Sequence, residues 1–325
     1  MPNSDVPNNL VSQWSTATFS DSRAVDDFFM GRKSARYIPW FNATLANQGP
    51  WANVKLVDTP QNDVLFHQFW NQIAHIFGGD CSVIQFVSLM SIISNEQRGD
   101  FFPKAELMGV AGHPGMAYLF DRIAGAKRSY NTLAGNKTAL DCFNDPDYIG
   151  AHQALPMGAQ LARTTDALWS GELWPTGIAT DPKVSVSGFI TQADFMKFRG
   201  RGLIQTTGRA NYTPLVDFVQ SYAGTNSTLD FYQHRWTGMS NDQVASITTN
   251  DDWDRLFQQS DLIIATEAVR VHSEKSGGYL ALSSNPPTLN GTGHGSIFNM
   301  GHCISGGQAY AATFKQRVIT VLEAL

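Results

Sequence analysis

The strongest hydrophobic pattern in the chain lies between residues 81 and 95. Apolar side chains fall on most of the circumference of a helix there: Val83, Ile84, Phe86, Val87, Leu89, Met90, Ile92 and Ile93. A helix that is apolar on most sides runs through a protein interior, so this segment is predicted to be a core helix. It ends at Asn95-Glu96-Gln97-Arg98-Gly99, which places a carboxyl group at the edge of a buried element.

Helical spacing recurs along much of the chain, and strand patterns are few. Helices are predicted at 63–77, 117–124, 151–168, 212–222, 251–257, 260–272 and 306–325, with short helices between 23 and 49. Residues 1–22 are polar and are expected to form a loosely ordered lead-in. The sequence therefore predicts a mainly α protein, with an N-terminal extension at 1–75 and one larger domain at 76–325.

Composition narrows the class of protein. The 325 residues are 42% hydrophobic and 16% charged, which is typical of an ordinary globular protein. The net charge of -5 and the lack of a long Lys/Arg run argue against a nucleic-acid partner. The sequence contains no run of about 18 apolar residues, so no membrane span is predicted.

The three cysteines and eight histidines show no metal-ligand spacing, so neither a metal nor a cofactor is predicted. Cys81, Cys142 and Cys303 lie far apart, and an odd number of them is not a disulfide framework. The N-terminus lacks a basic region followed by an apolar one, so no signal peptide is visible.

Candidate chemistry is concentrated in the segment Phe198-Arg-Gly-Arg-Gly-Leu-Ile-Gln-Thr-Thr-Gly-Arg-Ala-Asn-Tyr212. Gly200 and Gly202 alternate with Arg199 and Arg201, which predicts a tight turn that lets another group approach the backbone. Both arginines are expected to be structural and to pair with nearby carboxylates.

After this turn, Leu203 and Ile204 are expected to anchor the segment in a core. Three short neutral side chains accompany them, and amides and hydroxyls suit the hydroxyl and N-acetyl groups of a sugar: Gln205, Thr207 and Asn211. Local turn or cap hydrogen bonds are the simpler interpretation of each.

This segment resembles the signature of the family 19 glycoside hydrolases, which include chitinases and phage-type endolysins. The signature runs aromatic-x-Gly-Arg-Gly-x-Ile-Gln-x-(Ser/Thr)-x-x-x-Asn-Tyr, and every fixed position is met. The resemblance implies a lysozyme-like, two-lobed domain with a central substrate cleft. It also implies that Gln205 and Asn211 bind sugar and that Thr207 positions the attacking water.

Glycoside hydrolysis usually needs two carboxyl groups, one protonated and one ionised. The family's acid motif, His-Glu-(Ser/Thr)-x-Gly, resembles Asn95-Glu96-Gln97-Arg98-Gly99, so Glu96 is the predicted acid. Glu106 is the predicted base, with Glu172 and Asp100 as alternatives. If Glu106 is the base, the family implies inversion of the anomeric configuration.

A weaker likeness lies near the C-terminus. Ile304-Ser305-Gly306-Gly307 resembles the family's Ile-Asn-Gly-Gly, with Ser305 at the substrate-contacting position. The arginine that follows in the family has no clear counterpart, since Arg317 stands further along.

The resulting hypothesis is hydrolysis of β-1,4 linkages in an N-acetylglucosamine-containing polymer, with peptidoglycan favoured over chitin. Such an enzyme would be an endolysin, a muramidase or an exported antibacterial effector. It would be made in the cytoplasm and act on the cell wall outside it, with no export or immunity partner identifiable. A chitinase, a catalytically inactive glycan-binding relative and a structural component of a toxin or phage particle remain the alternatives.

Overall fold

The computed structural model describes residues 8–106, 146–147, 150, 197–275, 288–293, 295–305 and 307–325. The prediction of a mainly α protein is confirmed for these residues, whose only paired strands are two short ones. They fall into two compact units. Unit 1 takes its described residues from Met1–Lys104, Gly202–Ile204 and Phe257–Leu325, and unit 2 from Ala105–Arg201 and Gln205–Leu256.

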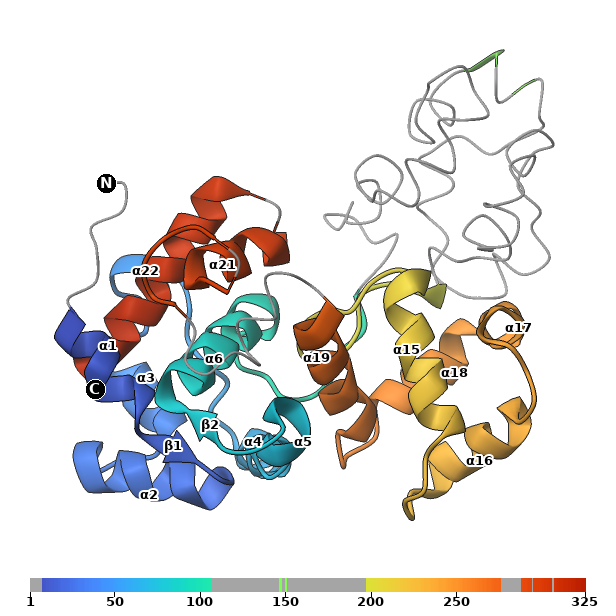
Figure 1. Cartoon of the computed structure of the whole chain (residues 1–325), viewed down its shortest axis with the longest axis horizontal. Helices are drawn as coiled ribbons and strands as arrows, with labels where there is room; N and C mark the ends of the chain where they lie inside the picture. Colours follow the sequence, from blue (N-terminus) through green and yellow to red (C-terminus); the bar gives the residue numbers. More distant parts are fainter. Residues whose placement is uncertain are drawn as a thin grey trace. The chain divides into compact units, whose positions relative to one another are not determined.

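Unit 1 is built around the predicted core helix, α6, shown in teal in Figure 1. Its described elements are α1 (Asn8–Ser15), β1 (Thr18–Phe19), α2 (Ser22–Lys33), α3 (Tyr37–Thr44), η1 (Gly49–Trp51), α4 (Pro60–Trp70), α5 (Ile73–Phe77), β2 (Cys81–Ser82), α6 (Val83–Gln97), α19 (Ile263–Lys275), α21 (Ile297–Ser305) and α22 (Gln308–Ala324). The strands β1 and β2 pair antiparallel, with Phe19 opposite Cys81.

Helix α6 is buried from Val83 to Ser94, as its apolar pattern predicts. Ser82 and Gln85 form a capping box that satisfies the first turn. The helix also buries three serines without leaving their hydroxyls unpaired, because each donates to the carbonyl oxygen four residues earlier: Ser88, Ser91 and Ser94. Arg98 then ends the helix in a left-handed conformation, with φ 54°.

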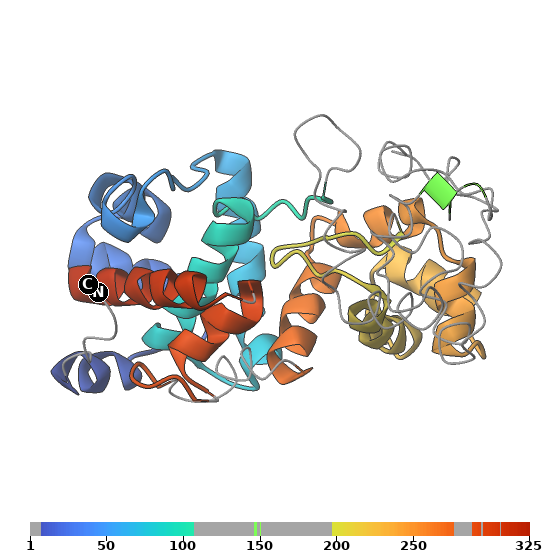
Figure 2. The ribbon, with the colours of Figure 1, turned by 90° about the horizontal axis from the view of Figure 1, so that it is seen from above.

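The C-terminal helix α22 packs against α6, η1 and α1, and α21 lies beside it (Figure 2). Trp14 of α1 is buried, and its indole Nε1 donates to the carbonyl oxygen of Leu322 at 3.0 Å. The expectation that residues 1–22 are a loose lead-in is therefore wrong from residue 8 onward. The polar composition of this segment did not indicate helix α1, because the residue that Trp14 contacts, Leu322, lies 308 residues away.

Unit 2 contains α15 (Arg209–Gln220), α16 (Ser227–Trp236), α17 (Asn241–Ile247) and most of α18 (Asn250–Phe257). Its core includes a group of edge-to-face and tilted aromatic rings contributed by Phe198, Tyr212, Trp236 and Trp253. Two of these rings bracket the segment 198–212, so the aromatic ends of the signature are core residues. The predicted helices at 117–124 and 151–168 lie outside the described residues.

Candidate functional site

The signature segment enters its turn through a short backbone pairing. Arg201 and Thr206 exchange both backbone hydrogen bonds, at 3.1 and 2.8 Å. Ala105 forms a second bridge with Arg201, and the amide of Glu106 donates to the carbonyl oxygen of Gly200 at 2.7 Å. The loop that carries the predicted base is therefore hydrogen-bonded directly to the signature.

The two arginines of the segment are structural, as expected. The fully buried Arg201 donates to Asp254 Oδ1 at 2.6 Å and to Asn250 Oδ1 at 2.6 Å. Arg199 donates to Asp254 Oδ2 at 2.9 Å. Burial raises the pKa of Tyr212, whose hydroxyl stays protonated and donates to the carbonyl oxygen of Arg199 at 2.7 Å. These contacts hold the turn rigidly on α18.

Three predicted site residues converge on Gly200, and we call Glu106, Gln205 and Thr207 the Gly200 cluster. A Cβ atom added to Gly200 would lie 2.8 Å from Gln205 Oε1, 3.2 Å from Thr207 Oγ1 and 3.3 Å from Glu106 Oε2. The amide of Gly200 also donates to Glu106 Oε2 at 3.3 Å. A Cβ at this position would occupy the space that the three polar groups share, so their present arrangement depends on glycine at position 200.

Gln205 adopts a left-handed backbone conformation, with φ 51°. A non-glycine residue in this region is strained, and such strain is concentrated at functional sites. The Thr207 hydroxyl donates to the carbonyl oxygen of Gln205 at 2.8 Å. Asn211 is tied locally, since its side-chain nitrogen donates to the carbonyl oxygen of Thr207 at 2.8 Å.

The tip of the turn belongs to unit 1. Leu203 and Ile204 are buried, as predicted. Gly202 accepts a hydrogen bond from Gln97 Nε2 at 3.4 Å, in the last turn of α6. This hydrogen bond lies within unit 1 and joins Gly202 to the last turn of the helix that carries Glu96.

Glu96 is half-buried in the last turn of α6, within unit 1. Asn95 Nδ2 donates to Glu96 Oε1 at 2.8 Å. Arg317 of α22 donates through Nη1 to Asn95 Oδ1 at 2.8 Å. Arg317 stands well beyond Gly307 in the sequence, and the packing of α22 against α6 brings its guanidinium to Asn95.

The remaining predicted site residues are Asp100, Ser305 and Glu172. Asp100 is paired with Lys104 and accepts from the amide of Phe102 at 2.9 Å. Ser305 is the last residue of α21, and its side chain is not among those described. Glu172 lies outside the described residues.

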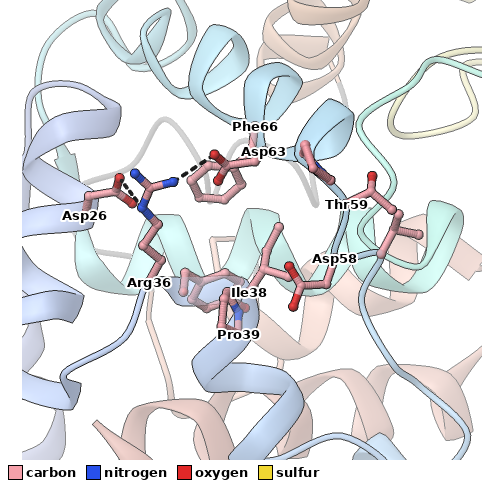
Figure 3. A pocket seen from close by; sticks show the side chains of 11 residues that line it. Asp26, Arg36, Ile38, Pro39, Asp58, Thr59, Asp63 and Phe66 are labelled. Carbon is pink, nitrogen blue, oxygen red and sulfur yellow. Dashed lines mark hydrogen bonds and ion pairs between the residues drawn. The ribbon is translucent and has the colours of Figure 1, made fainter.

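A cavity of about 320 Å³ lies elsewhere in unit 1, against α2, α3 and the start of α4 (Figure 3). Arg36 in its wall pairs with Asp26 at 3.2 Å and with Asp63 at 2.7 Å. One guanidinium thus pairs with two carboxylates, and the wall of the cavity carries a structural ion-pair network. None of the predicted catalytic or sugar-binding residues lines it.

Comparisons of the chain with protein-family models, with curated proteins and with solved structures found no match. Within the described residues, no group of three or more His, Cys, Asp or Glu side chains has the arrangement of a metal site. None of the described helices has the length and apolar character needed to cross a membrane.

Proposed function

We propose that this protein is a glycoside hydrolase that cleaves β-1,4 linkages in an N-acetylglucosamine-containing polymer, most readily peptidoglycan, through a lysozyme-like cleft. The observation that carries the proposal is the Gly200 cluster. A carboxylate, a side-chain amide and a hydroxyl lie around one glycine, and two of the three come from a segment that matches a hydrolase signature at every fixed position.

Glu106 is the general base in this proposal. Its Oε2 accepts the amide hydrogen of Gly200, which favours the ionised carboxylate that a base requires. Glu106 removes a proton from a water molecule held by Thr207, and the water oxygen attacks the anomeric carbon. Gln205 supplies an amide to orient the sugar, and Asn211 assists from the first turn of α15.

Glu96 is the general acid. As the glycosidic C–O bond breaks, the proton of Glu96 passes to the leaving oxygen, and direct attack by water inverts the anomeric configuration. Partial burial beside the apolar residues of α6 suits a carboxyl group that must stay protonated near neutral pH. Gln97, which donates to the carbonyl oxygen of Gly202, lies in the same last turn of α6 as Glu96.

The test is release of soluble fragments from purified peptidoglycan and, separately, from chitin. Glu96→Gln and Glu106→Gln are each expected to lower kcat by about 10²–10⁴-fold, the usual contribution of general acid or base catalysis. Asp100→Asn is the matched control, because this nearby carboxylate is already paired with Lys104. It is expected to keep wild-type activity.

Each alternative predicts a different result. Loss of activity in Asp100→Asn but not in Glu106→Gln would transfer the base role to Asp100. Faster release from chitin would identify a chitinase. A wild-type protein that binds either polymer but releases nothing is a glycan-binding relative, and the hydrolase proposal is then wrong.

A further inference from the structure

We infer that Asn95 is a positioning residue for Glu96, whose carboxyl group it holds in place through Oε1. The inference rests on the proposed function. Its basis is an unbroken series of contacts in unit 1, in which Arg317 donates to Asn95 and Asn95 donates to Glu96, each at 2.8 Å.

The orientation of the Asn95 amide follows from the chemistry of its partner. A guanidinium group has only donors, so the oxygen of Asn95 faces Arg317 and its NH₂ group faces Glu96. Glu96 Oε1 is therefore occupied as an acceptor.

Arg317 is itself fixed from two directions. Its Nε donates to the carbonyl oxygen of Pro50 at 2.9 Å, and its guanidinium lies 5.1 Å from the centre of the Trp51 ring. Trp51 is fully buried, so the support beneath the guanidinium is rigid. The amide of Asn95 is consequently held in one orientation by a group that cannot rotate freely.

The side-chain amide of Asn95 lies between the Arg317 guanidinium and the Glu96 carboxyl group, and it is bonded to both. A guanidinium hydrogen-bonded directly to Glu96 would favour the ionised carboxylate and oppose its use as an acid. Asn95 transmits the orientation without bringing the positive charge into contact. Tyr310 lies on α22, the helix of Arg317, and burial and the charge of Glu96 raise its pKa. Its hydroxyl group is therefore neutral and adds no charge beside Glu96.

Two departures from the resembled family therefore belong together in this chain. The acid motif has Asn95 where the family has His. The first arginine after Gly307 is Arg317, which lies within α22 and further along the chain than the family's arginine. Their hydrogen bond makes them one functional pair, and this predicts that their effects on catalysis are coupled.

The experiment is a double-mutant cycle of Asn95→Ala and Arg317→Ala, measured as kcat and KM for peptidoglycan fragments. Each single variant is expected to lower kcat about 10-fold or more with KM nearly unchanged, because misplacing a catalytic group by about 1 Å can cost up to about 100-fold. The kcat of the double variant is expected to be no lower than that of the less active single variant, because Arg317 acts through Asn95.

The pH profile separates positioning from folding. Asn95→Asp keeps an acceptor for Arg317 but replaces the donor to Glu96 with a negative charge, so the alkaline limb of kcat/KM is expected to move to higher pH. Asn42→Ala is the matched control, because the Asn42 amide in the same unit exchanges both of its described hydrogen bonds with the backbone of Leu56. It is expected to lower the stability without moving that limb.

The two proposals fail in distinguishable ways. If the wild type is active while the Asn95 variants retain kcat within threefold, or if the two losses multiply, the inference is wrong and the hydrolase proposal stands. If the wild type releases nothing from either polymer, the proposed function is wrong and the inference falls with it.

Discussion

At the scale of single residues, the two glycines of the turn have different roles. The Cβ of a Gly200→Ala variant would meet the far ends of three side chains, which can move aside at little cost in stability. Moving them separates Gln205, Thr207 and Glu106. We expect kcat/KM to fall about 10-fold or more while the free energy of unfolding changes by less than about 1 kcal/mol.

Gly202→Ala is the control for that prediction. Gly202 has φ 75°, and an added Cβ would lie 2.9 Å from the ring of Phe257, which is buried. Backbone strain and overpacking each cost about 1–3 kcal/mol, so this variant is expected to lose stability. Urea denaturation and fragment-release assays on both variants test the contrast. Equal losses of stability would show that Gly200 is only a structural glycine.

At the scale of elements, the end of α6 is strained at one exposed position. Arg98 caps the helix in the left-handed region, where a residue with a Cβ is disfavoured by about 1–2 kcal/mol. Arg98→Gly is expected to raise the free energy of unfolding by about 0.5–1 kcal/mol, the strain relief less the added freedom of the unfolded chain. Arg98→Ala keeps the strain and is expected to bring no gain. Chemical denaturation measures both, and an equal gain in both would contradict the strain argument.

Helices with a continuous apolar face were predictable from the sequence, and those held by distant partners were not. The predicted core helix and the C-terminal helix correspond to α6 and α22, shifted by two residues at each end of α6 and by two at the start of α22. The predicted helix at 63–77 is instead α4 and α5, which are separated at Asn71–Gln72. Periodicity alone did not reveal that break. The side chains of both residues are hydrogen-bonded to other parts of the chain, Asn71 to Ser22 and Gln72 to Asp261.

The same distinction applies to the candidate site. The pattern within 198–212 was enough to select Gln205 and Thr207 as candidate site residues. It could not indicate that Asp254, more than 50 residues later, anchors both arginines. Nor could it indicate that Arg317 meets Asn95 across 222 residues. Contacts of this range come from packing, which a local pattern does not encode.

At the scale of the whole molecule, the stability of unit 1 depends on a charged clamp between α2 and α4. His67 Nε2 lies 2.8 Å from Asp26 Oδ2, and its Nδ1 lies 2.6 Å from the carbonyl oxygen of Asp63. A carboxylate and a carbonyl both accept, so the protonated imidazole, in which both ring nitrogens donate, is the form that satisfies both contacts. Burial lowers the pKa of His67, but its bonds to Asp26 and Asp63 and their charges outweigh burial and raise it above 6.5.

This clamp predicts a loss of stability on the alkaline side. A group whose pKa is higher in the folded than in the unfolded protein contributes fully below the unfolded value, about 6.5, and its contribution is lost as the pH rises through the folded value. The stability difference between wild type and His67→Gln is therefore expected to be largest near pH 5.5 and to shrink by pH 8.5. Calorimetry of both proteins at these pH values measures it, since other titrating groups are common to both and cancel. A difference that stays constant would mean that His67 is neutral and that the clamp carries no charge.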